Sequence, residues 1–482
     1  MIRSLAAAAA SAVLTLSCAG AQETFTAQQA RADLAELYEG LERAHYDLFE
    51  RTPKRVFDQR YEALRRAFDG PVAAEDLHTE LQRFVALAQH GHARINTRNP
   101  AWSAHLEAGG RLFPLDLAIH EGEVIVTGAL ESAAVRPGDR ILAIDAMANP
   151  IWLERIMRNI SAETPALAHS IIERFGVLYF WIEFGDQAYY DITYERDGER
   201  RSTRIEAVDF DTWRASGGRE DAFTLDGREA GMASPEIAYL RPGPFYNLQA
   251  RTEEEAFDPD AVAAFVDFID ESFAGFIEAG AQALVLDLRD NPGGDSSFSD
   301  PVIAWFADRP FKFVSQFRLK VSPETTASNQ ARLDARPEGQ GGVSARYAEL
   351  FATARNGETV LFDVPAAQPR DGRRFEGEVY VLVNRFSYSN AVSAAALIQD
   401  YGFAVILGEP TRDMATSFGA METFTLENSG FRVGYAKAHI IRPNGEARLH
   451  ALTPDIALPA PVIRGERDLM LEAAVELIAA RH

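Results

Sequence analysis

A short apolar strand in the C-terminal half constrains the fold of this 482-residue chain more than any other feature. The run from Ala283 to Leu286 contains no polar residue, which is typical of a strand buried on both faces of a sheet. A helix pattern that begins at Asp258-Pro259 precedes it. Strand patterns at 379–383 and 404–407 follow it, with a helix from about Asn390 to Asp400 between them. Because alternating strands and helices form βαβ units, we expect an α/β fold with a largely parallel sheet.

The region before residue 90 contains three helical patterns. Thr26-Ala-Gln-Gln29 has the form of a capping box at the start of the first one. Apolar residues recur at helical spacing in each pattern, and they are Leu34, Leu37, Leu41 and Leu48, then Phe57, Tyr61, Leu64 and Phe68, and last Leu77, Leu81, Phe84 and Leu87. We therefore expect an N-terminal helical domain over residues 22–105, which includes the unusual segment Gln89-His90-Gly91-His92.

The N-terminus has the residue order of a secretory signal. Met1-Ile2-Arg3 is followed by an apolar run to Leu16 and then by Ala19-Gly20-Ala21. We expect residues 1–21 to be a signal peptide and the mature protein to be exported, either periplasmic or extracellular. Cys18 is the only cysteine, and its lipidation is the alternative that would attach the protein to a membrane. Cleavage after Ala21 would remove this cysteine, which excludes disulfides, a thiol nucleophile and a zinc–thiolate site.

The composition is that of a globular protein with an acidic balance. The chain is 47% hydrophobic and has a formal net charge of −23. Binding to a phosphate backbone needs clustered lysine and arginine, so we expect no nucleic-acid partner. The histidines are not spaced as metal ligands and no nucleotide-binding loop is visible, so we expect no metal and no cofactor. Nothing in the composition indicates an oligomeric state.

Two segments that join a strand to a turn carry the residues able to do chemistry. The first is Val285-Leu-Asp-Leu-Arg-Asp-Asn-Pro-Gly-Gly294, a buried strand that enters a glycine turn. Glycines allow backbone amides to approach a ligand closely, as an oxyanion hole requires. The second is the strand Tyr380-Val-Leu-Val-Asn384, the turn Arg385-Phe-Ser-Tyr-Ser389 and a helix of small residues from Asn390. A serine between a strand and a helix start exposes its hydroxyl beside free helix amides, which favours Ser389 as a nucleophile.

Other polar residues of these segments have structural interpretations. We interpret Asp287 and Arg289 as a buried pair that braces the glycine turn. Ser387 and Ser393 are spaced less well from the helix start than Ser389. The Gly-x-Ser-x-Gly elbow of ordinary lipases and esterases is absent around Ser389.

The region over residues 106–207 resembles a PDZ domain. Ser132-Ala-Ala-Val-Arg-Pro-Gly138-Asp139 leads into the strand pattern Ile141-Leu-Ala-Ile144, an order that members of that family often show. The Pro-Gly pair suits the tight turn between them. A helical pattern from Pro150 to Glu173 departs from the family, because a compact PDZ domain would be shorter there. An ordinary β-rich domain with a Pro-Gly turn is the alternative.

The chain as a whole resembles the tail-specific, or C-terminal processing, peptidase family. The resemblance rests on Asp-Leu-Arg-x-Asn-x-Gly-Gly, on Asn-x-x-x-x-Ser before an alanine-rich helix, and on Gly408-Glu-Pro-Thr411 after the next strand. The order of helical unit, PDZ-like domain and core also matches. The resemblance implies a ClpP- or crotonase-like spiral βαβ core over residues 208–482 with an inserted PDZ-like domain. It further implies a serine-type peptidase whose partner is a peptide or protein substrate.

The resemblance also implies roles for individual residues. Ser389 would be the nucleophile, and the amide of Asn390 together with one from Gly293 or Gly294 would bind the oxyanion. C-terminal processing enzymes pair the serine with a lysine on the segment after the Gly-x-x-Thr turn, but Arg412-Asp-Met-Ala-Thr-Ser-Phe-Gly419 contains none. A Ser–Lys dyad is therefore not expected.

The tricorn-core and retinoid-binding-protein-like branch of the family places a histidine before the PDZ-like domain. His90-Gly91-His92-Ala93 resembles that motif, which implies that His92 is the general base. Glu446 precedes a segment similar to the end of the family, so we name it as the third catalytic residue that would orient the imidazole. A solvated loop carboxylate is the alternative interpretation of Glu446.

Three functional hypotheses follow. The first is an exported serine peptidase that acts by acyl transfer. The second is a catalytically inactive peptide-binding or scaffold protein of the same fold, because fold does not determine activity. The third is a serine hydrolase of non-peptide esters that uses the same serine.

Overall fold

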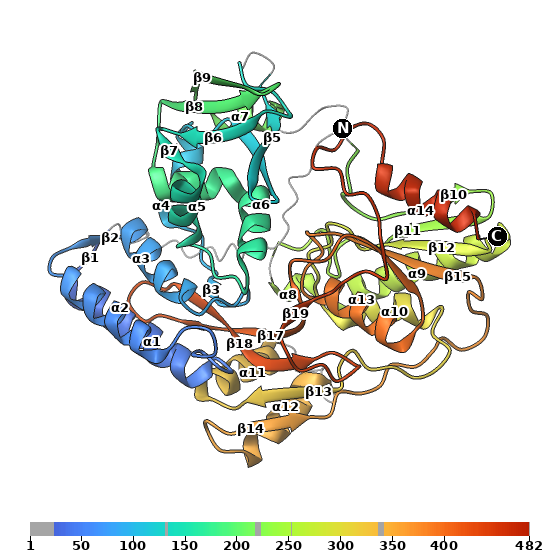
Figure 1. The fold of residues 1–482 in the computed structure, drawn as a ribbon. Coiled ribbons are helices and arrows are strands. Elements are labelled where there is room, and N and C mark those ends of the chain that lie inside the picture. The colour runs from blue at the N-terminus through green and yellow to red at the C-terminus, as the bar shows by residue number, and fades with distance from the viewer. Residues whose placement is uncertain (1–23, 131–133, 217–222, 252, 336–341, 482) are drawn as a thin grey trace.

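The computed structural model describes residues 24–130, 134–216, 223–251, 253–335 and 342–481 (Figure 1). The expected signal peptide and Cys18 lie outside the described residues. No helix within the described ranges is both long enough and apolar enough to span a bilayer. The structure combines many helices with three six-stranded sheets, which confirms the predicted mixed α/β class.

The core is built on a six-stranded sheet in the order β10-β11-β12-β15-β16-β20. Its strands are β10 (Glu229–Ser234), β11 (Ile237–Arg241), β12 (Ala283–Asp287), β15 (Glu378–Val383), β16 (Val405–Gly408) and β20 (Ile456–Ala457). Every neighbouring pair from β11 onward is parallel, whereas β10 runs antiparallel to β11 at the edge. The prediction of a largely parallel sheet is therefore confirmed.

Helices cover both faces of this sheet. They are α9 (Pro259–Glu278), α10 (Ser296–Ala304), α13 (Asn390–Tyr401) and α14 (Leu469–Ala479), and the short helix α8 (Glu253–Ala256) precedes α9. Successive strand residues point to opposite faces, and β12 shows the result. Leu284 and Leu286 pack with α9, α10 and α13, whereas Ala283 and Val285 pack against α14. Burial on both faces explains why β12 has no polar residue before Asp287.

The N-terminal part is helical, as expected (blue in Figure 1). Its elements are β1 (Thr24–Phe25), α1 (Ala27–Ala44), α2 (Lys54–Ala67), β2 (Val72–Ala73), α3 (Ala74–Ala86), β3 (Arg94–Ile95) and α4 (Pro100–Glu107). The capping box is present, because the Thr26 hydroxyl accepts from the Gln29 amide and the Gln29 side chain accepts from the Thr26 amide. The apolar faces of α1, α2 and α3 meet in one buried cluster.

The region expected to be PDZ-like forms a sheet in the order β4-β5-β6-β8-β9, with β7 beside β6. Its elements are β4 (Leu115–His120), β5 (Glu123–Ala129), β6 (Arg140–Ile144), β7 (Met147–Ala148), α5 (Asn149–Met157), α6 (Pro165–Phe184), β8 (Tyr189–Arg196), β9 (Glu199–Glu206) and α7 (Phe210–Ser216). The helical pattern from Pro150 to Glu173 is two helices. The second starts at Pro165, where the Thr164 hydroxyl accepts from the Leu167 amide and caps the first turn.

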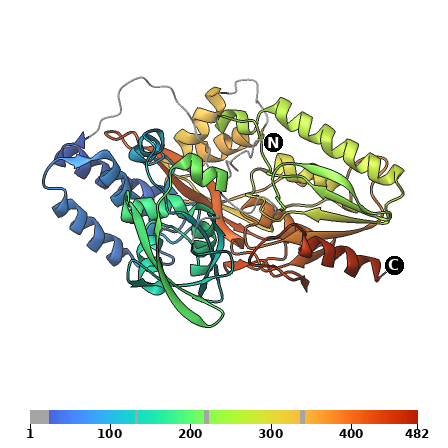
Figure 2. The same cartoon turned by 90° about the horizontal axis from the view of Figure 1, so that it is seen from above.

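A third sheet, which the sequence patterns did not indicate, joins these parts. It has the order β14-β13-β18-β17-β19, and β3 pairs with β18. Its elements are β13 (Gln316–Lys320), α11 (Pro323–Ala335), α12 (Val343–Thr353), β14 (Thr359–Phe362), β17 (Met414–Thr425), β18 (Arg432–Ile441) and β19 (His450–Ala451). Figures 1 and 2 show β17 and β18 running between the N-terminal helices and the core. The segment 322–358 contains α11 and α12.

Candidate active site

Ser389 lies where the chain passes from the parallel sheet into a helix. β15 ends at Val383, and Ser389 is the residue immediately before α13. Its backbone has φ 52° and ψ −124°, a conformation that a residue with a side chain rarely adopts. Such strain persists only where the surroundings enforce it, and it is frequent at catalytic sites. The structure therefore holds the Ser389 hydroxyl at the N-terminal end of a helix.

His92 faces this serine from the opposite end of the sequence. Its Nε2 atom lies 3.4 Å from the Ser389 hydroxyl oxygen. The imidazole also stacks on the Tyr388 ring, with 5.6 Å between ring centroids and 22° between ring planes. His92 sits in the turn between α3 and β3, and β3 is fixed because Arg94 and Ile95 pair with β18. The structure thus brings together Ser389 and His92, two residues named from the sequence.

The surroundings of His92 favour the neutral imidazole. Burial, followed by the nearby charges of Arg94 and His90, lowers the pKa of His92 to about 4. Its Nδ1 atom is buried on the side of the Phe418 carbonyl, but no acceptor in the described part of the chain meets hydrogen-bond geometry with it. A neutral imidazole near pH 7 can accept the serine proton, as a general base must.

His90 is a structural neighbour. It is fully buried and stacks on His45, with ring centroids 4.9 Å apart. Its amide donates to the Ser161 hydroxyl at 3.0 Å, and that hydroxyl donates back to the His90 carbonyl at 2.8 Å. The turn that carries His92 is therefore fastened to the segment between α5 and α6.

The glycine turn of the first motif packs directly against the nucleophile. A Cβ atom added to Gly293 would lie 2.6 Å from the Asn390 amide nitrogen and 2.8 Å from the Ser389 Cβ atom. The Gly293 amide itself donates to the Asn291 side chain at 2.9 Å, so it is already occupied. The Gly294 and Asn390 amides donate no hydrogen bond within the described structure. Of the three expected oxyanion donors, these two have free N–H groups.

Gly294 is the position in this turn that tolerates a side chain least. Its φ is 138°, and an added Cβ atom would lie 2.0 Å from the Phe245 carbonyl oxygen. We expect Gly294→Ala to destabilise the protein by at least about 2 kcal/mol, since the strand–turn contact must move. The matched control is Gly372→Ala, which also has positive φ but meets open space. Urea unfolding should show a much smaller loss for the control, and equal losses would contradict the steric argument.

Asp287 and Arg289 form the buried brace that the sequence indicated. The Arg289 guanidinium donates to both Asp287 oxygens at 2.9 and 2.6 Å. It also donates to both oxygens of Asp468, at 2.7 and 2.6 Å. The Tyr239 hydroxyl donates to Asp287 at 2.8 Å. This network fixes the end of β12, where the glycine turn begins, to the start of α14.

The structure does not bring Glu446 to His92. The Glu446 carboxylate accepts hydrogen bonds from the Arg448 amide and guanidinium, and the side chain is partly solvated. Arg448 lowers the pKa of Glu446 to about 2, which is the behaviour of a loop carboxylate in an ion pair. The Glu446 carbonyl contacts the third sheet, where it accepts from the Thr416 hydroxyl.

Two other carboxyl groups reach the catalytic segments, and the sequence analysis missed both. Glu163 accepts from the amide of Gly91, the residue before His92, at 3.0 Å. Asp413 accepts from the amide of Ser389 at 2.5 Å. Asp413 lies in the segment that carries the lysine in C-terminal processing enzymes. The sequence analysis considered this segment only for a lysine and assigned no role to its carboxyl group. Glu163 lies between two helices of the inserted region and has no sequence pattern of its own.

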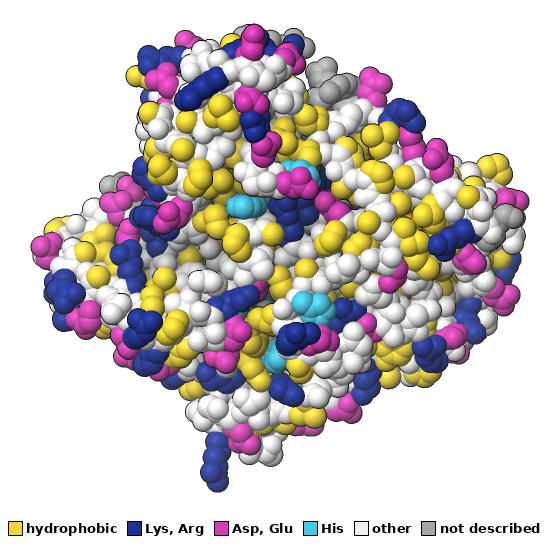
Figure 3. Space-filling model, in the orientation of Figure 1, with side chains coloured by type: hydrophobic (Ala, Val, Ile, Leu, Met, Phe, Trp, Pro, Cys, Tyr) yellow, Lys and Arg dark blue, Asp and Glu magenta, His cyan; other side chains and the backbone are white. Residues whose placement is uncertain are grey.

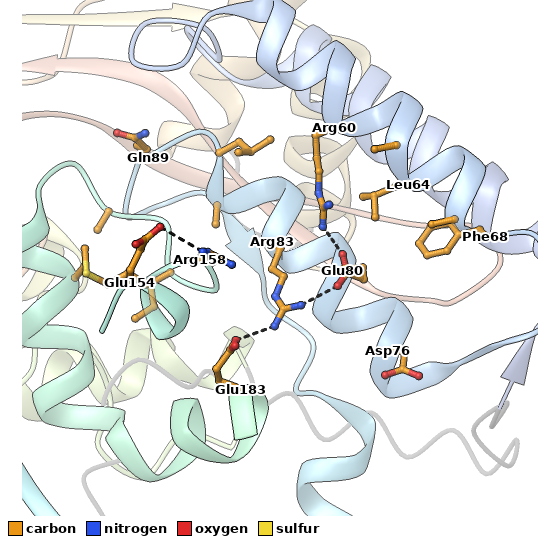
Figure 4. Close-up of a pocket in the computed structure, with 18 of the residues that line it drawn as sticks. Arg60, Leu64, Phe68, Asp76, Glu80, Arg83, Gln89, Glu154, Arg158 and Glu183 are labelled. Atoms are coloured by element: carbon orange, nitrogen blue, oxygen red, sulfur yellow. Dashed lines mark hydrogen bonds and ion pairs between the residues drawn. The ribbon is translucent and has the colours of Figure 1, made fainter. Parts of the chain in front are cut away.

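A cavity of about 1120 Å³ lies behind these residues, where α2 and α3 meet α5 and the start of α6 (Figure 4). Charged pairs cross it, including Arg60 with Glu80 and Arg83 with Glu183. Glu163 contributes to its wall. On the face in Figure 3, acidic and basic side chains are interspersed, so the negative net charge does not form a single field there. The described residues contain no group of three His, Cys, Asp or Glu side chains placed to hold a metal ion.

Comparison with known proteins assigns this arrangement to a family. Residues 256–458, which contain Ser389, the glycine turn and Asp413, match the model of peptidase family S41. This segment of the core is therefore similar to peptidase family S41. The match supports a serine peptidase, and it agrees with the resemblance drawn from the motifs. None of the curated protein sequences compared with the chain matches it.

Solved structures share the fold of this protein. Mature CPAF aligns with a TM-score of 0.58 at 15% identity, covering 94% of this chain and 96% of CPAF. Mature CPAF complexed with lactacystin gives 0.58 at 15% identity, with 94% and 97% coverage. A point mutant of CPAF gives 0.60 at 14% identity, with 94% and 96% coverage. At such low identity these likenesses establish a shared fold over nearly the whole chain.

Proposed function

We propose that this protein is an exported S41 peptidase that cleaves peptide bonds by acyl transfer, with Ser389 as nucleophile and His92 as general base. The observation that carries the proposal is the 3.4 Å approach of His92 Nε2 to the Ser389 hydroxyl at the start of α13. The lack of a lysine between Arg412 and Gly419 favours this Ser–His pair and the tricorn-like branch. The signal-like order of residues 1–21 supports export.

The reaction follows from the geometry. The Ser389 hydroxyl attacks the carbonyl carbon of the scissile bond while His92 Nε2 takes the hydroxyl proton. Negative charge develops on the carbonyl oxygen, and the Gly294 and Asn390 amides are the donors placed to bind it. The imidazolium then gives its proton to the departing amine, which leaves an acyl ester on Ser389. Water, deprotonated by the same imidazole, releases the acid product.

The PDZ-like assignment of residues 106–207 remains part of the proposal. A module of this kind holds an extended peptide as an added strand on a sheet edge. β4 is an edge strand of its sheet, because its one sheet neighbour among the described strands is β5. A peptide or protein substrate is therefore the partner that the structure favours.

The proposal is tested by labelling the purified mature protein with a fluorophosphonate probe. We expect one adduct by intact mass and peptide mapping to Ser389, because the probe reacts with an activated serine. His92→Ala should abolish labelling while leaving the protein folded. The intact mass also checks export, since the mature chain should begin near Gln22. An adduct on another serine would contradict the assignment, and a folded wild type that is never labelled would support the inactive-scaffold alternative.

The ester-hydrolase alternative is separated by substrate preference. A panel of peptides and short-chain esters should show turnover of peptides that depends on Ser389. Turnover restricted to the esters would favour the alternative.

A further inference from the structure

The carboxyl groups of Glu163 and Asp413, near the catalytic pair, are buried and only partly hydrogen-bonded. Glu163 is 4% exposed and Asp413 is 1% exposed. Each uses one oxygen to accept from an amide of a catalytic segment, Gly91 in one case and Ser389 in the other. The second oxygens, Glu163 Oε2 and Asp413 Oδ1, are buried and have no partner among the described residues. A buried carboxylate oxygen without a partner is costly, so both groups cannot carry a full charge cheaply.

The charge of Asp413 acts on Glu163, and both groups lie beside the segments that carry the catalytic pair. Burial and then the charge of Asp413 raise the pKa of Glu163, and burial raises the pKa of Asp413. A Cβ atom added to Gly91 would lie 2.7 Å from the Tyr388 hydroxyl and 3.3 Å from Glu163 Oε2, so both reach the backbone beside His92. Two neighbouring buried carboxyls favour one shared proton over two charges.

Few other charges face this pair. The amides of Gly91 and Glu163, and after them the charge of Arg51 in the loop after α1, lower the pKa of Glu163. The amides of Ser389 and Met414 lower the pKa of Asp413. Tyr388 stays neutral, because burial raises the pKa of its hydroxyl well above the ordinary value. Arg94 and His90 act on His92 from β3 and from the turn. None of these groups makes a hydrogen bond to Glu163 Oε2 or Asp413 Oδ1.

We propose that Glu163 and Asp413 are positioning residues that fix the base and nucleophile segments, and that the pair holds one negative charge which offsets the imidazolium formed on His92 during turnover. This inference rests on the proposed function of Ser389 and His92. The pair exchanges no proton with the substrate: the serine proton goes to His92 and then to the leaving amine. In this arrangement Glu163 and Asp413 replace Glu446, which was expected to orient the imidazole, as the carboxyl groups that support His92.

A shared charge predicts a specific pattern of mutant effects. Glu163→Gln and Asp413→Asn keep the oxygens that accept from the amides and remove only the ability to ionise. In each single variant the remaining carboxyl loses its proton and keeps the charge, so we expect the rate of fluorophosphonate labelling to fall only about 2- to 5-fold. The double variant has no charge, and we expect a loss of about 10- to 100-fold.

The pH profile of labelling gives a readout that a purely structural role would not move. Removing a negative charge near an imidazole lowers its pKa. The acid limb of the profile should therefore shift to lower pH by about one unit in the double variant and little in the single variants. The matched control is Glu183→Gln, a buried glutamate that pairs with Arg83 and Arg155 and touches no catalytic segment. It should leave the profile unchanged.

The charge state can be read without activity by infrared difference spectroscopy at neutral pH. Wild-type minus either single variant should show the carbonyl band of one protonated carboxyl, because each substitution forces the partner to ionise. If the double variant does not fold, this measurement still tests whether the pair holds one proton. Because it does not depend on activity, it also separates failure of this inference from failure of the Ser389 assignment.

Three results would overturn the inference. The first is a double variant that labels within 2-fold of wild type with an unmoved acid limb. The second is the absence of the carboxyl band from both difference spectra. The third is a Glu446→Gln variant that by itself reproduces the rate loss and the shift, which would return the role to Glu446.

Discussion

Ser389→Ala is expected to lower kcat for a peptide substrate by about 10⁴- to 10⁶-fold, because without its hydroxyl no acyl ester can form. The fold should survive, since Ser389 makes no side-chain cap for α13 and the Asp413 contact uses its amide. His92→Ala should lose a similar factor, and the double variant should be no worse than either single one, since the two residues act as a unit. Steady-state kinetics with Ser393→Ala as the matched control on α13 checks this. Equal losses in the control would point to a structural effect.

The pH dependence of the wild type follows from the same pair. The base must be neutral to accept a proton, and burial lowers the pKa of His92 to about 4. We therefore expect kcat/KM to hold as pH falls from 7 through the ordinary histidine range and to decline only near pH 4 to 5. A decline centred near 6.5 would show that His92 is less buried in solution than in this structure.

Arg289→Met is expected to destabilise the core by about 3–5 kcal/mol. Arg289 is 3% exposed and Asp287 is fully buried, so removing the guanidinium leaves a buried carboxylate without its main partner. The contact between β12 and Asp468 at the start of α14 is lost at the same time. Urea unfolding followed by tryptophan fluorescence should show a lower midpoint.

The matched control for this substitution is Arg201→Met, which removes an exposed pair with Glu199 on β9. An exposed ion pair contributes about 0–1 kcal/mol, so its loss should be small. If Arg289→Met lowers the free energy of unfolding as little as Arg201→Met does, the brace does not stabilise the glycine turn. Activity should fall together with stability in Arg289→Met, because the same turn carries Gly294.

The sequence predicted the parts of the fold that depend on local pattern. The apolar run of β12 predicted a strand buried on both faces, and apolar residues at helical spacing predicted α1, α2 and α3. The change from a strand pattern to a helix pattern identified Ser389 as the candidate nucleophile. The third sheet was not predicted, because β17 and β18 pair with segments as distant as β3 and such pairings leave no local pattern. The Asp287–Arg289 pair was anticipated, but its link to Asp468 depends on a contact across 179 residues.

Some residues of the candidate site could likewise be predicted from the sequence, and others could not. His92 was named only because a motif resembled a family, and the structure then placed it beside Ser389. Glu446 was named from its position before a family-like segment, yet it lies with Arg448. Glu163 and Asp413 could not be selected from spacing, because a carboxyl becomes informative only when its burial and its partners are known.

The distance between His92 and Ser389 along the chain has a consequence for the biosynthesis of the enzyme. The two residues are 297 positions apart, and the turn that holds His92 is fixed by β18, which follows Ser389 in the sequence. Contacts of such wide separation form late in folding, since the loop between them must close first. A ribosome that has delivered His92 and even Ser389 has therefore not yet made a working peptidase. A chain cut short before residue 432 would be inert, so synthesis does not expose the cell to its activity until the last strands are in place.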